Sequence, residues 1–522
     1  MRGEDVRPEP TRPHAPARDP RSPLPVESGF DLLKSPIVVA ILVTIAAAGL
    51  FGIFFLLYQW YGQAPHRLFK IFFGMILLTV LMTRPRWALV MVVFSMPFVE
   101  WLPKSGAPML NSLNLIMIAL LLAALFSAIS TRTSVLLPSA LKKPILFFLA
   151  WAFLAWFHAL IVPFSESITP LIRLRLLHNG LFGVYLFFLV HRLLAAMPAE
   201  DAQRWIKNLA ILMAVSAALG TLGLLWQSSG LRQGVRVAGG LGDINKAATY
   251  YAMALIWTFS MRRVMGRALW SRLAYVGLIF FNTLGLVLPN SRGGFVAFLV
   301  AGVGFSLSRG AKGLAVGLVL LATVPFWVPD YVQERFQETI GVFDAESDRF
   351  GAINESAGGR LEFWEAAIDV IIHHPILGVG YGAMPEATAA AVGRYRNTHN
   401  FYLELTGEMG IPALLILMLI FYRVIRKARR LSRSREVPDW VQAVGEGTVW
   451  LSVALLVANI FGTRFLSYAL AGYFFLAAAL LERATQEDLW PLRSRSDCSM
   501  TEEGDIPQNP NETERRPDGH SD

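Results

Sequence analysis

The sequence has 522 residues, of which 54% are hydrophobic and only 16% are charged. This composition excludes an ordinary soluble globular domain, in which about 25% of the residues are charged. The formal net charge of +9 does not indicate nucleic-acid binding, because the basic residues alternate with apolar segments and form no single patch. The single cysteine, Cys498, excludes disulfide frameworks and CxxC metal or redox sites.

The N-terminal residues 1–34 are predicted to be a disordered cytoplasmic tail. Prolines recur among mixed charges in this stretch, and such a composition cannot bury enough apolar surface to fold. The apolar segment Ile37 to Leu57 follows, and it is long enough to span a hydrocarbon core as a helix. Because no small-residue cleavage site follows it, we interpret it as a retained anchor and not as a signal peptide.

Apolar segments recur over residues 35–329 and again over residues 411–483. At roughly 20 residues per span we count about fourteen, and twelve or thirteen also fit because several are short. They begin near Ser35, Leu68, Trp87, Leu113, Pro144, Gly180, Leu209, Ala247, Ala274, Gly293, Gly313, Ile411, Val449 and Phe465. The predicted fold is all-α, a polytopic transmembrane helical bundle of about 12–14 spans.

The basic residues near span ends predict the orientation, because Lys and Arg are retained on the cytoplasmic side. The most basic loop, Arg423 to Arg435, is therefore placed in the cytoplasm. Counting spans from this loop puts four more basic groups on the same side: Arg84/Arg86, Lys142/Lys143, Arg262/Arg263/Arg267/Arg272 and Arg309/Lys312. Both termini then lie in the cytoplasm, including the polar residues 484–522, which are predicted to be disordered.

The hydrophilic residues 330–410 form one large external loop in this topology. Loops beyond about 15 residues are usually functional or disordered, and the pattern of this one predicts helices. Between Arg360 and His374, one helical face carries Leu361, Trp364, Ile368 and Ile371, which predicts an amphipathic helix at the membrane surface.

A glycine-rich turn follows this helix at Gly378-Val379-Gly380-Tyr381-Gly382. We interpret the turn as structural, because no βαβ unit surrounds it as a nucleotide-binding loop would require. A second helical stretch is predicted to run through His399 to a break at Gly410 and Pro412.

Cations gather on the external side, where the positive-inside bias predicts few: Arg173, Arg175, Arg232, Arg236, Lys246, Arg292, Arg360, Arg394 and Arg396. Ionisable residues at membrane depth are costly and usually face a cavity or a charged partner. Guanidinium groups donate paired hydrogen bonds to phosphate oxygens, so a diphosphate is a fitting ligand. For any single arginine, snorkelling or pairing with a loop carboxylate is the ordinary alternative.

Arg292 and Arg360 are the strongest of these candidates. Arg292 lies in Asn290-Ser291-Arg292-Gly293-Gly294 at the external end of two spans, where glycines allow close approach to the backbone. Arg360 begins the amphipathic helix, so a phosphate bound there would also meet unpaired helix amides.

His399 is the candidate for proton transfer, in Asn397-Thr398-His399-Asn400-Phe401. A neutral imidazole can take a proton from a hydroxyl near neutral pH, and Glu404 or Glu408 could orient it. A helix-capping histidine is the ordinary alternative. Asn245 is a further candidate for binding sugar, although an Asp or Asn in the run Asp243 to Lys246 can equally start a helix.

Three of these motifs resemble the O-antigen ligase and Wzy-type polymerase family, which are integral membrane glycosyltransferases of bacterial lipopolysaccharide and exopolysaccharide assembly. The motifs are Ser291-Arg292-Gly293-Gly294, Gly359-Arg360-Leu361-Glu362-Phe363-Trp364, and His399-Asn400-Phe401-Tyr402-Leu403 followed by Glu408-Met409-Gly410. Their order, around one large external loop, agrees with the family over about residues 235–420.

The resemblance implies a metal-independent enzyme without cofactors, in the bacterial inner membrane, with its active site facing the periplasm. Its donor would be an undecaprenyl-diphosphate-linked glycan, and its acceptor lipid A-core or another lipid-linked glycan. Arg292 and Arg360 would bind the diphosphate, and His399 would activate the acceptor hydroxyl. Further substrate-binding residues are expected at Arg232, Arg236, Asn245 and Asn400.

Several alternatives stay open. A multispanning transporter would show internal repeats and charged residues near the bilayer midplane, and neither is clear in this sequence. A protein O-oligosaccharyltransferase of the same family and a non-catalytic assembly scaffold also remain. The motifs do not separate a ligase from a polymerase, because the two share the donor chemistry.

Overall fold

In the computed structural model, the described residues are 76, 78–81, 84–102, 112–161, 169–229, 236–266, 268–315, 317–318, 359–395, 397–465, 467–486 and 489. The chain divides into two compact units, Met1–Ile76 and Leu77–Asp522. Only Ile76 is described in the first unit, so the fold is that of the second. The predicted N-terminal tail, the span near Ser35, parts of the spans near Leu68 and Gly313, residues 330–358 of the external loop, and the predicted C-terminal tail except residues 484–486 and 489 lie outside the described residues.

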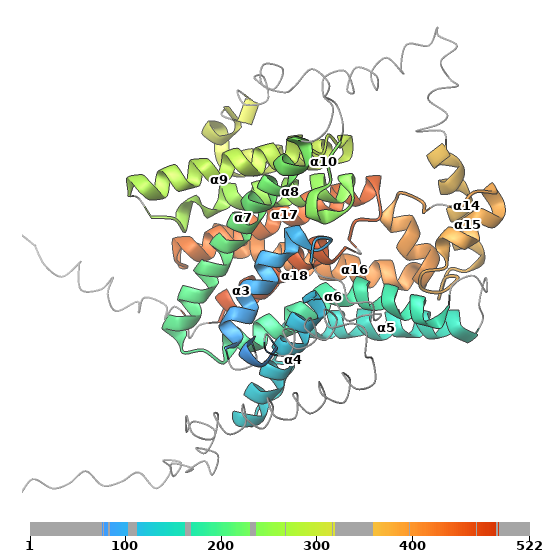
Figure 1. The fold of residues 1–522 in the computed structure, drawn as a ribbon, viewed down its shortest axis with the longest axis horizontal. Helices are drawn as coiled ribbons and strands as arrows, with labels where there is room; N and C mark the ends of the chain where they lie inside the picture. The colour runs from blue at the N-terminus through green and yellow to red at the C-terminus, as the bar shows by residue number, and fades with distance from the viewer. Residues whose placement is uncertain are drawn as a thin grey trace, which may run out of the picture. The chain divides into compact units, whose positions relative to one another are not determined.

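Every regular element in the described ranges is a helix (Figure 1). They are α3 (Pro85–Ser95), α4 (Ser112–Ser130), α5 (Lys142–Ile161), α6 (Pro170–Ala195), α7 (Ala199–Ser229), α8 (Ile244–Ser260), α9 (Leu269–Val287), α10 (Arg292–Ser308), α14 (Gly359–His373), α15 (Met384–Val392), α16 (Phe401–Arg433), α17 (Asp439–Ala458) and α18 (Tyr468–Ala484), with short 3-10 turns that include η2 (Met96–Phe98) and η7 (Asn459–Phe461).

Seven of these helices are long and apolar enough to cross a membrane: α4, α5, α6, α7, α9, α16 and α17. Two shorter apolar helical stretches, Pro85–Phe98 and Arg292–Ser308, accompany them. The predicted all-α, polytopic membrane bundle is therefore confirmed.

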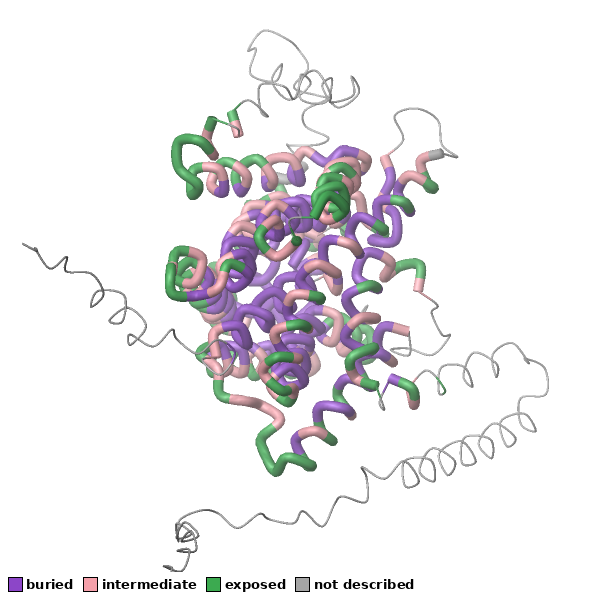
Figure 2. The backbone as a smooth tube through the Cα atoms, turned by 90° about the vertical axis from the view of Figure 1, so that its left-hand side faces the viewer, coloured by how far each residue is buried: buried purple, intermediate pink, exposed green. Residues whose placement is uncertain are grey.

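The centre of the bundle is formed by α8 and α18, which are buried along almost their whole length (Figure 2). A helix that is apolar on every face is expected to be surrounded by other helices. α18 packs against α6 and α17, and α8 packs against α9, α10 and α17. Outer helices expose apolar side chains instead, such as Val276 and Phe280 on α9, as lipid-facing surfaces do.

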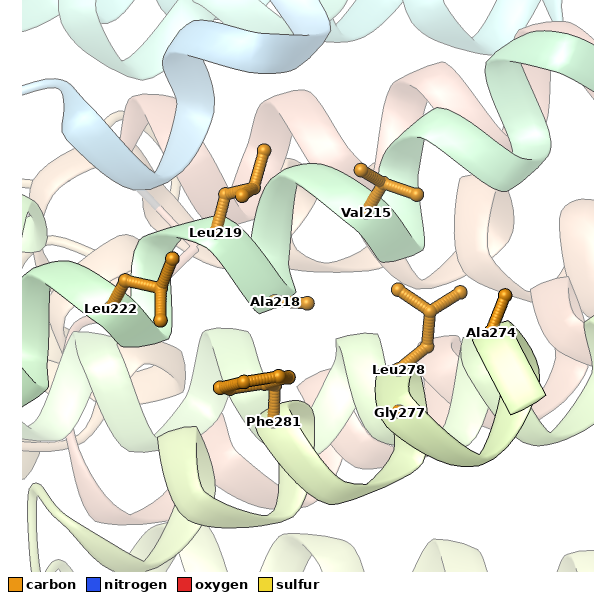
Figure 3. Close-up of a pocket in the computed structure, with 8 residues that line it drawn as sticks. All are labelled: Val215, Ala218, Leu219, Leu222, Ala274, Gly277, Leu278 and Phe281. Atoms are coloured by element: carbon orange, nitrogen blue, oxygen red, sulfur yellow. The ribbon is translucent and has the colours of Figure 1, made fainter.

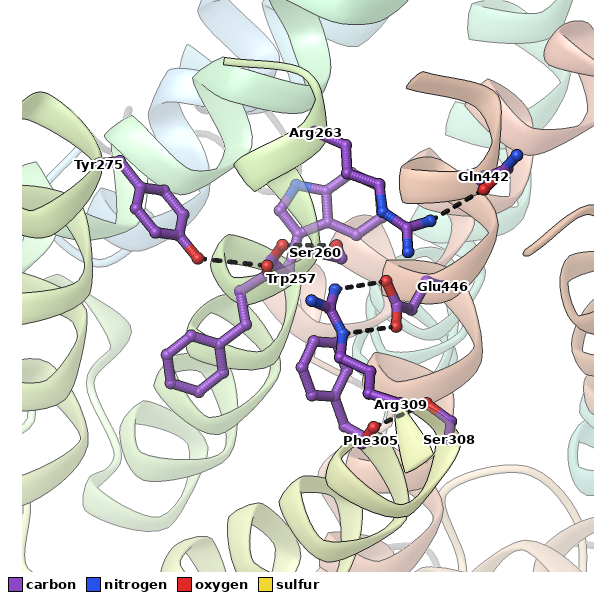
Figure 4. Close-up of polar contacts among 10 residues, drawn as sticks. Trp257, Ser260, Arg263, Tyr275, Phe305, Ser308, Arg309, Gln442 and Glu446 are labelled. Carbon is purple, nitrogen blue, oxygen red and sulfur yellow. Dashed lines mark hydrogen bonds and ion pairs between the residues drawn. The ribbon is translucent and has the colours of Figure 1, made fainter. Parts of the chain in front are cut away.

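Polar contacts join the basic segments that the sequence assigns to one side of the membrane. Arg309 makes a bidentate ion pair with Glu446 of α17, with nitrogen–oxygen distances of 3.0 and 2.7 Å, and Arg263 donates to Gln442 (Figure 4). The ion pairs Arg86–Asp201 and Lys427–Glu482 tie further loops of this group together. The structure thus gathers these segments at the same end of the bundle, in agreement with the predicted topology.

Exposed tryptophans mark both ends of the bundle. Trp87 and Trp270 lie at the start of α3 and α9, next to the basic segments. Trp101 lies just after η2, which continues α3, and Trp226 lies in the last turn of α7. Both are therefore at the opposite ends of these helices from the basic segments. Tryptophan is enriched at both membrane–water interfaces, so these positions fit a bundle that spans a bilayer.

The long helix α16 is broken at Gly410, whose φ of 79° and ψ of 170° are not helical. The break leaves the carbonyl oxygens of Gly407, Glu408 and Met409 without their helical partners. The N–H of Ile411 donates to Pro375 instead, and Pro412 has no N–H. The freed oxygens of Gly407 and Glu408 accept from the N–H groups of Val379 and Gly380, at 2.8 and 3.1 Å.

The indole of Trp151 donates to the third oxygen, that of Met409, at 2.8 Å. The predicted break at Gly410 and Pro412 is confirmed. Through the N–H groups of Val379 and Gly380, the turn at residues 378–382 completes the hydrogen bonding of the broken helix. This agrees with the interpretation of the turn as structural.

The predicted helix from Arg360 to His374 is present as α14. Phe363 and Ala367, which lie outside the predicted apolar face, are buried in a small core with Met384 of α15 and the turn residue Val379. Ile368 of the predicted face is 48% exposed, so its placement at a membrane surface stays a prediction.

Gly410→Ala should destabilise the protein strongly, because the new Cβ would lie 1.8 Å from the carbonyl oxygen of Ile376. Left-handed backbone alone costs about 1–2 kcal/mol for a residue with a side chain, and the clash adds to that cost. Thermal unfolding of the purified protein in detergent measures the effect.

Gly393→Ala is the matched control. Its φ of 74° is also left-handed, but its new Cβ would meet nothing within 4 Å. Equal losses of melting temperature in the two variants would contradict the packing role of Gly410.

Candidate functional site

The turn between α9 and α10 brings Arg292 to the start of α10. Asn290 is buried and has a positive φ of 48°, and Ser291 precedes the helix in an extended conformation. The side chain of Ser291 makes no cap hydrogen bond to α10, and its hydroxyl donates to Asn245 at 2.7 Å. The carbonyl oxygen of Ser291 accepts from the N–H groups of Gly294 and Phe295 at 3.0 and 3.1 Å, so Ser291 is bonded to both α8 and α10.

The two glycines after Arg292 have specific packing reasons. A Cβ on Gly294 would lie 2.4 Å from the Cβ of Ala248 on α8, and one on Gly293 would lie 2.7 Å from a guanidinium nitrogen of Arg464. No side chain fits at these distances. The close backbone approach that the glycines predicted is therefore present, with α8 on one side and Arg464 on the other.

Two other predicted substrate-binding residues lie beside the same turn. Asn245 lies in the first turn of α8, directly after the N-cap residue Asp243 and Ile244. Its side-chain oxygen accepts the hydrogen bond from Ser291. Arg236 donates through Nε to the carbonyl oxygen of Pro289 at 3.5 Å. Arg232 lies outside the described residues. The structure brings Arg236, Asn245 and Arg292 into one neighbourhood.

His399 stands at the start of α16 in the left-handed conformation, with a φ of 53°. Asn400 is the N-cap of α16, and its side-chain oxygen accepts from the N–H groups of Tyr402 and Leu403. Glu404 accepts two hydrogen bonds from Thr398, from the N–H at 3.0 Å and from the hydroxyl at 2.8 Å. The residues on both sides of His399 are therefore fixed by hydrogen bonds.

These contacts correct the predicted helix through His399. The helical stretch before it, α15, ends at Val392, and α16 starts only at Phe401. The Asn400 cap sets this boundary, because a capping side chain takes the place of the next turn of helix. Glu404 holds Thr398 in this arrangement through both hydrogen bonds, which fixes the loop beside His399.

The helix that Arg360 begins is attached to the His399 segment. The indole of Trp364 donates to the carbonyl oxygen of Thr398 at 2.9 Å. Arg360 is the second residue of α14, one helical turn before Trp364. The side chain of Arg360 lies outside the described part of the structure, but its helix is anchored one residue from His399.

The Arg292 and His399 segments meet at the turn between α17 and α18. Asn397 donates to the hydroxyl of Thr463 at 3.2 Å, and Arg464 lies against Gly293 and donates to Thr249 of α8. The three predicted motifs thus converge on one end of the bundle. This convergence is the geometry that a shared active site needs.

The sequence of this region matches a known family. Residues 277–418 match the family model described as O-antigen ligase. No curated protein matches the chain. The match runs from α9 into α16 and includes Arg292, Arg360 and His399, so the family resemblance of these motifs is confirmed. The chain is a multi-pass membrane protein of the glycan-transferring type, and the O-antigen ligase family acts on lipid-linked glycans.

Sequence reasoning missed Thr463 and Arg464, which lie outside the O-antigen ligase match. A signal was present: Arg464 directly precedes a predicted span on the external side, where each cation is a site hypothesis. Its partners could not be predicted from the sequence, because Gly293 and Thr249 are distant from Arg464 in the chain.

Two other external arginines are held by carboxylates. Arg173 is buried at the start of α6, 3.6 Å from Glu386 of α15, and it donates to the Tyr381 carbonyl. Arg394 pairs with Glu362 at 2.7 Å on the surface. Burial raises the pKa of Tyr381 well above its ordinary value, and Glu408 raises it further, so this phenol stays neutral. For Arg173 and Arg394 the ordinary interpretation as ion pairs holds, whereas Arg396 lies outside the described residues.

An apolar groove of about 250 Å³ lies between α7 and α9 (Figure 3). It is lined by Val215, Ala218, Leu219, Leu222, Ala274, Gly277, Leu278 and Phe281. Because these side chains carry no polar group, the groove cannot hold a diphosphate.

Asn400→Ala should lower stability by about 0.5–2 kcal/mol and reduce glycan transfer, because the start of α16 beside His399 loses its cap. Asn400→Ser should retain most of both, since serine caps helices nearly as well. Thermal unfolding and a transfer assay with the purified protein test this pair. If Asn400 instead binds sugar through its amide, as the sequence predicts, the serine variant should be as inactive as the alanine variant.

Proposed function

We propose that the protein transfers or polymerises a polyprenyl-diphosphate-linked glycan on the periplasmic face of the bacterial inner membrane. The arginines bind the diphosphate, and His399 activates the acceptor. The observation that carries this proposal is the convergence of the Arg292, Arg360 and His399 segments at one end of the bundle, through Thr463, Arg464 and Trp364.

The start of α10 is suited to a phosphate group. Arg292 supplies a guanidinium at the first residue of α10. Helix N-termini attract anions because their N–H groups and the helix dipole point toward them. Arg236 lies beside the same turn and adds a second positive charge. The leaving diphosphate gains negative charge in the transition state, and preorganised cations stabilise that charge.

The reaction is a direct displacement. The acceptor hydroxyl oxygen attacks the anomeric carbon of the donor glycan, and a new glycosidic bond forms. The bond between that carbon and the diphosphate oxygen breaks, and its electron pair leaves with the polyprenyl diphosphate. The hydroxyl proton passes to the His399 imidazole. Because attack and departure occur on opposite faces, the anomeric configuration is inverted.

Arg292→Ala and Arg360→Ala should each reduce the transfer rate by about 10²–10³-fold, the typical cost of removing one donor that stabilises developing charge. Both should also weaken binding of the lipid-diphosphate glycan. Arg394→Ala is the control, because this external arginine pairs with Glu362 at the surface. Near-normal transfer by Arg292→Ala, measured with purified protein and donor, would remove the diphosphate role.

His399→Ala should reduce the transfer rate by about 10²–10⁴-fold, but it should leave donor binding within about twofold of wild type, because the imidazole acts on the acceptor. Rate and donor affinity are measured on the same preparation. Unchanged turnover in His399→Ala would reduce the histidine to a loop residue at the start of α16.

The topology is tested with single cysteines in a Cys498→Ser background, since Cys498 is the only native cysteine. Tyr395→Cys lies in the predicted external loop, and Ser134→Cys lies between α4 and α5 on the predicted cytoplasmic side; both positions are exposed. An impermeant thiol reagent should label the first in intact spheroplasts and the second only after lysis. The reverse pattern would invert the proposed orientation.

A further inference from the structure

Arg464 is a buried cation at the turn between α17 and α18. It follows η7 and is only 2% exposed. A buried charge is costly unless hydrogen bonds compensate it. The buried guanidinium of Arg464 must therefore be compensated by hydrogen bonds to its neighbours.

The guanidinium of Arg464 connects α8, η7 and α10. Nη1 donates to the hydroxyl of Thr249 on α8 at 2.5 Å, and Nη2 donates to the carbonyl oxygen of Phe461 at 3.3 Å. The same Nη2 lies 2.7 Å from the position that a Cβ on Gly293 would take. The first turn of α10, which carries Arg292, thus rests directly on this guanidinium.

The residues on either side of Arg464 contact the His399 segment. Thr463 accepts a hydrogen bond from Asn397, two residues before His399. The ring of Phe465 packs against the ring of Phe401, two residues after His399, with a centroid distance of 5.5 Å. Three consecutive residues therefore touch both sides of the His399 loop and the helix of Arg292.

We propose that Arg464 is a positioning residue that fixes the start of α10, and with it Arg292, relative to His399. This inference rests on the proposed function and extends the set of functional residues beyond the segment matched to the O-antigen ligase family. Arg464 itself does not touch substrate, because it is buried behind Gly293. Its effect is geometric: a displacement of about 1 Å between reacting groups can cost about 10²-fold in rate.

Arg464→Lys tests the proposal, because lysine keeps the charge but has one nitrogen where arginine uses two. We expect kcat to fall at least tenfold while the KM for the lipid-linked donor changes by less than threefold. Arg483→Lys is the matched control, since Arg483 is 1% exposed and donates to the Leu194 carbonyl, in the last turn of α18 and away from the site. An equal loss of kcat in both variants, at similar melting temperatures, would overturn the positioning role.

The neighbouring contact supplies a second comparison. Thr463→Val removes the hydroxyl that accepts from Asn397, and Thr463→Ser retains it. The valine variant should lose kcat and the serine variant should recover most of it. Equal activity of the two variants would contradict a connection through this hydroxyl.

A distance measurement separates this proposal from the proposed function. Nitroxide labels at Leu299→Cys on α10 and Tyr395→Cys before α16, both exposed positions, report the separation of the two segments in a Cys498→Ser background. The distance distribution should broaden or shift in Arg464→Lys and remain as in the parent in Arg483→Lys. An unchanged distribution in Arg464→Lys would overturn the proposal whatever the activity. A changed distribution in a protein that transfers no glycan would instead overturn the proposed function alone.

Discussion

The break in α16 determines how the external loop is attached to the bundle. A carbonyl oxygen in a lipid environment must find a donor inside the protein, because no water replaces it. The break at Gly410 and Pro412 frees three such oxygens, and Val379, Gly380 and Trp151 satisfy them. The glycine-rich turn is therefore tied to α16 by bonds that the break itself requires. Because α14 and α15 flank this turn in the chain, the same bonds bring them to the start of α16, where His399 lies.

Glycine and arginine have complementary roles around the site. Gly293 and Gly294 remove the side chains that would keep Arg464 and α8 away from the backbone of α10. Arginines whose partners are carboxylates, such as Arg173 with Glu386, hold external segments to the bundle. Arg292 begins α10 directly before these two glycines, and the proposed function assigns it to phosphate recognition.

The sequence predicted the features that depend on local chemistry. Apolar length predicted the helical membrane bundle, and Gly410 with Pro412 predicted the break in α16, because both residues act on their own backbone. It failed where tertiary contacts choose between local options. The segment from Asn397 to Asn400 offers several residues that can cap a helix, and only the structure shows that Asn400 does so. In α14, the pattern did not indicate Phe363, which the structure buries in a small core with Met384 of α15. The contact between Arg464 and Gly293 joins distant parts of the chain and leaves no local pattern.

The position of α10 is set from both of its ends by α17 and the turn that follows it. At one end Arg309 grips Glu446 of α17 through two hydrogen bonds, and at the other Gly293 rests on Arg464. α17 also packs against α8, α10, α16 and α18, so it contacts both the helix that Arg292 begins and the helix that begins two residues after His399. The starts of these two helices are therefore tied to one shared helix of the bundle, independently of residues that lie between them in the chain.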